Sequence, residues 1–159
     1  MPHLYDGPFD AITQDGKVLI LKWKPETASM ETKQFFESMV RLGELTIEAD
    51  VHGILIDILD FRHKPTADVM AFREEHVIPI YNQTGIKRMA FLFPGESPGE
   101  ATQDAGGDYE VQRFTSENEA LTWAGRMPKF TEYPGVDHNC WDRAYRDPEL
   151  IRWLFGQSR

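Results

Sequence analysis

The apolar runs of this chain are short, and the residues that flank them predict the strands of a buried sheet. Residues 54–56 (Ile-Leu-Ile) follow Gly53 and lead into a polar loop that ends at Pro65. A short β-branched run bounded by turn residues is typical of the central strand of a parallel sheet, which is buried on both faces. Residues 88–93, which follow Gly85, predict a second buried strand.

A β-hairpin is predicted before these strands. Residues 9–13 alternate imperfectly between apolar and polar positions, and residues 18–23 return as a largely apolar run. The turn between them contains Asp15-Gly16, a dipeptide typical of tight hairpin loops. Residues 109–114 alternate and predict a further strand at or near an edge of the sheet.

Two helices are predicted between the strands. Residues 30–49 carry apolar side chains at helical spacing, and Ser29 is a candidate N-cap for this helix. The second helix follows the central strand and is capped by Thr66 or Asp68. Pro79 is expected to kink or end it, because proline has no backbone N–H to donate. The apolar side chains that we interpret as packing against the sheet are Phe35, Phe36, Met39, Val40, Leu42, Val69, Phe72, Val77 and Ile80.

A third, short helix is predicted where residues 116–119 (SENE) form a capping-box pattern before Ala120, Leu121 and Trp123. The predicted order of elements is therefore β-β-α-β-α-β-β-α. Helices that connect strands favour parallel pairing, so this order indicates the α/β class with a mixed sheet packed by helices. We expect this domain to occupy residues 1–126.

Residues 127–159 are expected to form an appended loop and helix. Asp147-Pro148-Glu149 is a favourable helix start, and five large apolar side chains follow within six positions. One contact surface cannot cover all of them, because they spread over more than one helix face. The tail therefore packs either on its own domain or across a homodimer axis, and we favour the homodimer. The five residues are Leu150, Ile151, Trp153, Leu154 and Phe155.

Composition narrows the choice of partners and compartment. The 159-residue chain has a formal net charge of −9, which argues against nucleic acid and anionic membranes as main partners. We expect no integral membrane segment, because no apolar run approaches the roughly 18 residues that a membrane helix needs. The N-terminus lacks the pattern of a secretory signal. Cys140 is the only cysteine, which favours a reducing compartment, so we expect a cytoplasmic protein.

Charged residues gather where the predicted central strand ends. Asp57, Asp60, Arg62 and His63 follow one another there. Ligands and partners of open α/β sheets bind outside the carboxyl ends of the strands, so we predict a partner-facing site at these four residues. Asp57 and Asp60 are three positions apart and do not share a strand face, which favours solvated acids over a catalytic pair.

Five segments between residues 18 and 123 form a series whose order and spacing are characteristic. They are Trp23 with Pro25-Glu26-Thr27, Leu55-Ile56-Asp57 with Phe61, Val77-Ile78-Pro79, residues 85–91 and residues 113–123. In this series the chain resembles the small SpoIIAA-like proteins of the STAS/SEC14 type. The resemblance implies a four- to five-stranded sheet backed by helices, with dimers common, and a regulatory or binding role. We therefore expect a non-catalytic STAS-like domain that binds a protein partner or an apolar small molecule and needs no cofactor.

The chain departs from the STAS pattern at the phosphorylation site. STAS-type anti-sigma-factor antagonists carry a phosphorylatable serine just after the central strand. Here residues 57–62 contain neither serine nor threonine, and Thr66 is the first hydroxyl side chain after the strand. Thr66 is thus the candidate if a phosphate switch exists, because a helix start favours a phosphate group.

A hydrolase is the alternative function. Residues 135–154 resemble the C-terminal end of esterase- or peptidase-type α/β-hydrolases, in which the residue matching His138 belongs to the catalytic triad. Residues 95–99 (GESPG) also match the G-x-S-x-G nucleophile motif at Ser97. Pro98 argues against it, because the oxyanion hole needs the backbone N–H of that residue. Asp137, His138 and Cys140 lack the remaining ligand of a four-ligand metal set, so we expect no metal.

Overall fold

The computed structural model describes residues 2–95, 102–103 and 106–126, together with Pro148, Arg152 and Gly156. The chain divides into two units, Met1–Met127 and Pro128–Arg159, and the fold described below belongs to the first. The apolar residues of the predicted C-terminal helix lie outside the described residues. The packing of that helix and the homodimer therefore remain predictions.

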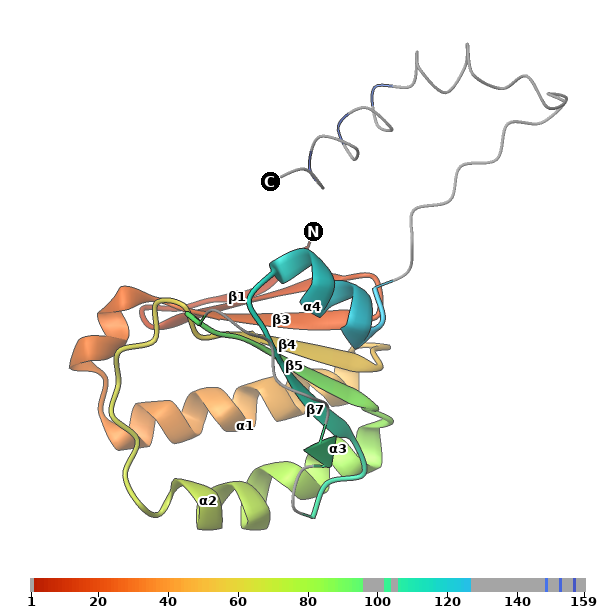
Figure 1. Ribbon diagram of the computed structural model, residues 1–159. Coiled ribbons are helices and arrows are strands. Elements are labelled where there is room, and N and C mark those ends of the chain that lie inside the picture. The colour runs from red at the N-terminus through yellow and green to blue at the C-terminus, as the bar shows by residue number, and fades with distance from the viewer. Residues whose placement is uncertain are drawn as a thin grey trace, which may run out of the picture. The chain divides into compact units, whose positions relative to one another are not determined.

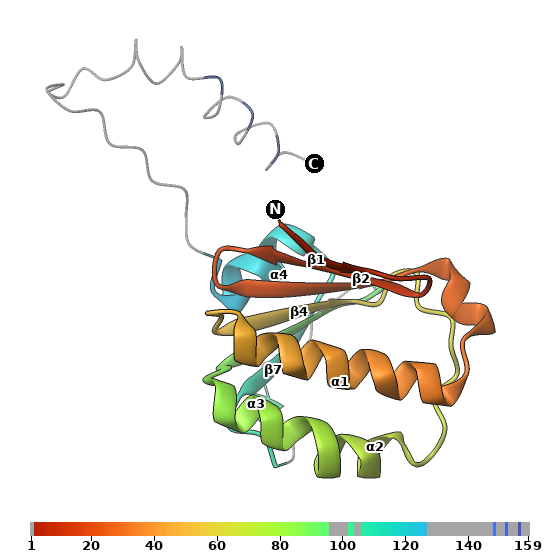
Figure 2. The same cartoon turned by 180° about the vertical axis from the view of Figure 1, so that it is seen from behind.

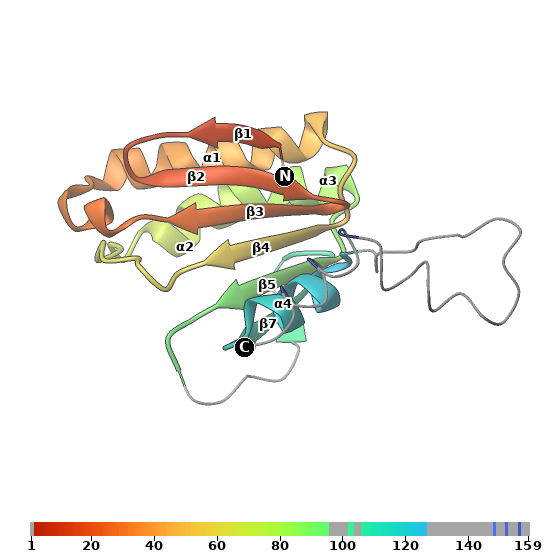
Figure 3. The same ribbon diagram turned by 90° about the horizontal axis from the view of Figure 1, so that it is seen from above.

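The centre of the fold is one mixed sheet of seven strands in the order β1-β2-β3-β4-β5-β7-β6 (Figures 1 and 3). Strands β3, β4, β5 and β7 pair in parallel, whereas β1, β2 and β6 run antiparallel to their neighbours. The predicted α/β class is confirmed. The strands are β1 (His3–Asp6), β2 (Asp10–Asp15), β3 (Val18–Trp23), β4 (Gly53–Asp57), β5 (Arg88–Leu92), β6 (Thr102–Gln103) and β7 (Glu110–Phe114).

The predicted number of four to five strands is too low, because β1 and β6 were not expected. Strand β1 has four residues, three of them exposed, so its sequence carries no apolar pattern. Strand β6 has only two residues and lies in a segment rich in glycine and acidic residues. Both pair with a neighbouring strand through backbone hydrogen bonds, which any residue type except proline can form.

Helices cover the two faces of the sheet unequally. Helices α1, α2 and α3 lie on one face and α4 lies on the other (Figures 1 and 2). The first face buries the larger apolar cluster, which includes Leu19, Leu21 and Ile54, and the second buries Val18 and Leu55 beneath α4. The helical elements are η1 (Pro25–Ser29), α1 (Thr32–Glu48), α2 (Val69–Phe72), η2 (Arg73–Val77), α3 (Ile78–Thr84) and α4 (Glu117–Ala124).

Helix α1 begins two residues later than its predicted start. Glu31 is the N-cap and forms a capping box with Gln34, whose side-chain oxygen accepts a 2.8 Å hydrogen bond from the Glu31 backbone N–H. The prediction that Ser29 caps this helix is therefore wrong. The Ser29 hydroxyl instead donates to the Glu26 carbonyl oxygen at 3.0 Å, inside the 3₁₀ turn that begins at Pro25.

Pro79 changes the hydrogen-bonding pattern of the second helical segment without ending it. The segment passes from α2 through the π-helical turn η2 into α3, and Pro79 stands in the first turn of α3. Because proline cannot donate to the carbonyl four residues earlier, the regular α-helical ladder is interrupted, and the wider π turn lies directly before it. Gly85 ends α3 with a φ of 80°, a conformation that glycine adopts without strain.

Gly53 allows α4 to pack closely on the sheet. A Cβ atom at this position would overlap the backbone carbonyl oxygen of Ala124, at the end of α4. The side chain of Ser116 begins the helix by accepting a hydrogen bond from the Glu119 backbone N–H. The apolar side chains that α4 buries against the sheet are Ala120, Leu121 and Ala124.

We predict that Gly53→Ala destabilises the domain by about 1–3 kcal/mol, because either β4 or α4 must move to remove the overlap. The matched control is Gly43→Ala in α1, where the added Cβ would lie 3.3 Å from the Ile80 Cδ1 atom and in ordinary contact, at 3.5 and 3.7 Å, with its Cγ2 and Cβ atoms. Urea denaturation followed by circular dichroism measures both variants. Equal stability of the two variants would contradict the close packing at Gly53.

A buried carboxylate joins β2 to α1. Asp10 is 1% exposed, and its Oδ1 atom accepts a 3.2 Å hydrogen bond from the Ser38 hydroxyl. A guanidinium nitrogen of Arg41 lies 3.6 Å from the other carboxylate oxygen, and the same guanidinium lies 3.9 Å from the centre of the Tyr5 ring. Burial raises the pKa of Asp10 above 3.8, and the nearby charge of Arg41 opposes that rise.

We predict that Asp10 makes the fold less stable as pH rises. Its pKa is raised in the folded state, so the folded protein binds the proton more tightly, and stability falls from about pH 4 upward through the folded-state pKa. Asp10→Asn removes this part of the pH dependence.

Asp6 changes the stability in the opposite direction with pH, because Lys24, 2.6 Å away, lowers the pKa of its carboxyl group. Asp6→Asn should remove a contribution that is lost as pH falls, and denaturation between about pH 3 and 6 compares the two.

Candidate ligand-binding cavity

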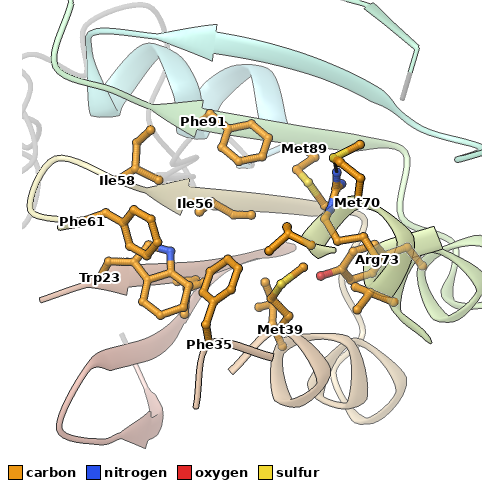
Figure 4. Close-up of a pocket in the computed structure, with 15 residues that line it drawn as sticks. Trp23, Phe35, Met39, Ile56, Ile58, Phe61, Met70, Arg73, Met89 and Phe91 are labelled. Carbon is orange, nitrogen blue, oxygen red and sulfur yellow. Dashed lines mark hydrogen bonds between the residues drawn. The ribbon is translucent and has the colours of Figure 1, made fainter. Parts of the chain in front are cut away.

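A cavity of about 270 Å³ lies between the sheet and the helices α1, α2 and α3 (Figure 4). Its floor is formed by side chains of three parallel strands: Leu21 and Trp23 of β3, Ile56 of β4, and Met89 and Phe91 of β5. Its other walls are Phe35, Met39 and Leu42 of α1, Ile58 and Phe61 of the loop after β4, and Val69, Met70, Arg73, Val77 and Tyr81 of the α2–η2–α3 segment.

Helix spacing explains why this space is not filled. Near its C-terminal end, α1 carries Gly43, whose missing side chain allows Ile80 of α3 to approach closely. Nearer the other end of α1, Phe36 stacks on Phe72 of α2, with ring centres 3.9 Å apart and planes 4° from parallel. Two stacked aromatic rings thus stand between the helices at this contact, whereas Gly43 places no side chain between them at the other. The cavity lies between these two contacts and the sheet.

The cavity has an aromatic end. The ring of Trp23 lies 5.0 Å from that of Phe61 and 5.5 Å from that of Phe35, measured between ring centres. The Phe35 and Phe61 rings are 5.6 Å apart. The rings are tilted relative to one another, an arrangement that favours edge-to-face attraction. This end of the cavity offers a flat, rigid and mostly apolar contact surface.

The other end is formed by flexible side chains and carries charge. Met39, Met70 and Met89 line the cavity there, and Arg73 lies beside Met70 and Met89 (Figure 4). Methionine is unbranched and adapts to ligands of different shape. A guanidinium nitrogen of Arg73 lies 3.8 Å from the Met70 sulfur atom. Among the described residues that line the cavity, Arg73 is the only one that carries a charge.

A second hollow continues the first along the sheet. It has a volume of about 440 Å³ and shares Ile58 and Phe91 with the cavity. In the described part of the chain, Arg113 of β7 is its only charged lining residue, and it pairs directly with Phe91 across the β5–β7 ladder. Phe91 therefore separates two adjoining hollows, each with one arginine. The remaining lining residues of the second hollow are Phe93, Pro94 and Val111.

Asp57, one of the four predicted site residues, is buried and holds the backbone turn after β4. It is 5% exposed, and its Oδ1 atom accepts a 3.0 Å hydrogen bond from the Leu59 backbone N–H. The Lys22 ammonium lies 3.9 Å from its other oxygen. These contacts assign Asp57 a role in shaping the loop that borders the cavity.

The other three predicted residues lie on that loop. Asp60 is half-buried, and Arg62 is exposed, with its backbone N–H donating to the Thr27 hydroxyl at 2.8 Å. The ring of His63 lies 5.4 Å from that of Phe35, at the aromatic end. Its Nε2 atom is buried and has no hydrogen-bond partner among the described residues. None of the four predicted residues lines the cavity itself.

The residues that line the cavity were expected from the sequence to be packing residues. Phe35, Met39, Val69 and Val77 have the helical spacing of a buried face, and that spacing is the same whether the face meets a filled core or a hollow. The one distinguishing signal is Arg73, a charged residue within the apolar stripe of the second helix.

Thr66 is exposed, and its hydroxyl donates a hydrogen bond to the carboxylate of Asp68 just before α2. No observation bears on its phosphorylation, which remains a prediction. Ser97 and His138, the residues of the alternative hydrolase function, lie outside the described residues. Residues 95–99 therefore cannot be compared with a nucleophile elbow.

In the described part of the chain, no group of three or more His, Cys, Asp or Glu side chains has an arrangement that could hold a metal ion. None of the helices in the described ranges combines the length and the apolar character needed to cross a membrane.

Comparison with protein-family models finds no match, and neither the curated proteins nor the solved structures contain a significant match to this chain.

We predict that Asp57→Ala destabilises the domain by about 1–2 kcal/mol, because the Leu59 N–H then loses its acceptor. The control is Asp60→Ala, three residues further along the same loop, which should change stability by less than about 0.5 kcal/mol. Urea denaturation of both variants makes the comparison. If the two substitutions had equal effects, the structural role of Asp57 would be refuted.

Proposed function

We propose that this chain is a non-catalytic, STAS-like binding domain that takes up an apolar small molecule in the cavity between sheet and helices. The observation that carries the proposal is the cavity itself, about 270 Å³ of space lined by apolar side chains and one arginine. An apolar pocket with a few polar groups is the usual form of a small-molecule site.

The size of the cavity supports a binding role over a packing defect. Protein interiors are packed about as densely as organic crystals, and voids larger than a water molecule are few. If the whole 270 Å³ were a closed, empty void, the loss of stability would reach about 6 kcal/mol at roughly 24 cal/mol per Å³. That upper limit is comparable to the total stability of a small domain. A bound apolar molecule would recover the missing contacts.

The shape of the site favours a small molecule over a protein partner. The apolar surface is concave and lies between secondary-structure elements, whereas a protein partner needs a broad exposed patch. Few large apolar side chains near the cavity are well exposed; Leu59 is 46% and Met70 50% exposed. The hydrolase alternative depends on Ser97 and His138, and no described residue favours it.

We predict that the full chain binds N-phenyl-1-naphthylamine, a neutral fluorophore whose emission rises in apolar surroundings. Ile56→Trp places a larger side chain on the cavity floor and should weaken binding by roughly tenfold or more. The matched control is Ile47→Trp, because Ile47 is 66% exposed on α1 and lines no part of the cavity. Fluorescence titration gives the affinities.

Thermal unfolding of both variants verifies that each is folded. The proposal is supported if only Ile56→Trp loses the fluorophore while both variants remain folded. It fails if the native chain does not bind the fluorophore, or if the two variants bind it equally well.

A further inference from the structure

We infer that the cavity takes up an apolar molecule with one neutral carbonyl group, whose oxygen accepts a hydrogen bond from the indole N–H of Trp23. This inference rests on the proposed function and adds the chemical class of the ligand. It follows from the burial of Trp23, from the position of its nitrogen in the cavity, and from the apolar side chains around that nitrogen.

Trp23 is a deeply buried residue whose side chain has one polar group, the indole N–H. The residue ends β3, is 3% exposed and lines the cavity. An indole N–H can only donate, and in buried positions it usually has a hydrogen-bond partner. Among the described residues, no group accepts a hydrogen bond from this nitrogen. The N–H is therefore a buried donor to which the described protein supplies no acceptor.

The nitrogen of Trp23 is open to the cavity. Within the described ranges, the side-chain nitrogen and oxygen atoms that lack both a partner and accessible surface belong to Asp10, Arg41 and His63. The Trp23 nitrogen is not one of them, so a molecule of the size of water can reach it. It lies on the side of the indole ring that faces Phe61 and Ile56, which both line the cavity (Figure 4). The N–H thus points at space that a bound molecule would occupy.

The surroundings of this N–H favour a neutral oxygen as its acceptor. The Phe61 ring, whose centre lies 5.0 Å from that of the indole, offers a π face, which is a weak acceptor compared with an oxygen atom. A charged oxygen would lose its hydration here for a single donor, a cost that a neutral carbonyl does not carry. The other described side chains that line this aromatic end of the cavity are apolar: Phe35, Ile56, Ile58 and Phe61.

A water molecule alone does not meet the same requirement. Buried waters usually form roughly two to four hydrogen bonds, and Trp23 is the one described side chain at the aromatic end that supplies a donor. A ligand with an apolar body needs only one acceptor for this one donor. Its body also gains contact with the tilted rings of Trp23, Phe35 and Phe61. The carbonyl group therefore orients the ligand, and the rings supply most of its contact surface.

Acetophenone and α-methylstyrene test the inference, because they have nearly the same shape and differ in a C=O group against a C=CH₂ group. Each is titrated into the ¹⁵N-labelled full chain and followed by ¹H–¹⁵N NMR. Both should bind, and only acetophenone should move the indole proton resonance of Trp23 downfield, since only its oxygen can accept the N–H. That resonance is assigned by elimination, from single Phe substitutions of the other tryptophans, Trp123, Trp141 and Trp153.

Trp23→Phe removes the donor and keeps an aromatic ring at the same position. The quantity to compare is the ratio of the acetophenone affinity to the α-methylstyrene affinity, because the hydrocarbon leaves water more readily in every variant. This ratio should fall roughly fivefold in Trp23→Phe, the effect of losing one ordinary hydrogen bond. The matched control is Phe35→Leu, which changes the neighbouring ring, keeps the N–H and should leave the ratio unchanged.

The outcomes distinguish this inference from the proposed function. If both molecules move the Trp23 resonance alike, or if the ratio is the same in all variants, the inference is overturned and the apolar site remains. If neither molecule binds, the inference is overturned, and the proposed function is lost with it when N-phenyl-1-naphthylamine also fails to bind. Should Trp23→Phe not fold, the Trp23 resonance in the native chain decides alone.

Discussion

The parallel pairing of β3, β4, β5 and β7 is the constraint on which the rest of the structure depends. Parallel neighbours need a crossover connection, and right-handed crossovers from β3 to β4 and from β4 to β5 place α1 and then α2 and α3 on the same face. Between β5 and β7 the described residues include β6 but no helix. The second hollow lies beside these two strands, where Phe91 of β5 and Arg113 of β7 line it.

The cavity follows from the same constraint together with the choice of residues on the two crossovers. The helices must lie side by side over adjacent strands, so their spacing depends on what stands between them. Gly43 permits close approach at one point, and Phe36 with Phe72 imposes separation at another. The π turn before Pro79 also changes the direction in which η2 presents Arg73 and Val77, since each residue of a π helix turns through a smaller angle than in an α-helix.

The elements with a strong periodic signal could be predicted from the sequence. The turn dipeptide Asp15-Gly16 predicted the β2–β3 hairpin, and the apolar run after Gly53 predicted strand β4. The structure contains both elements at these residues. Strand β1 could not be predicted, because its pairing uses backbone groups and its side chains are mostly exposed. The predicted cap at Ser29 is wrong because Ser29 belongs to the 3₁₀ turn that begins at Pro25, and Glu31 caps α1 instead. A hollow leaves no periodic trace in the sequence, so the cavity could not be predicted, whereas the charged loop beside it could.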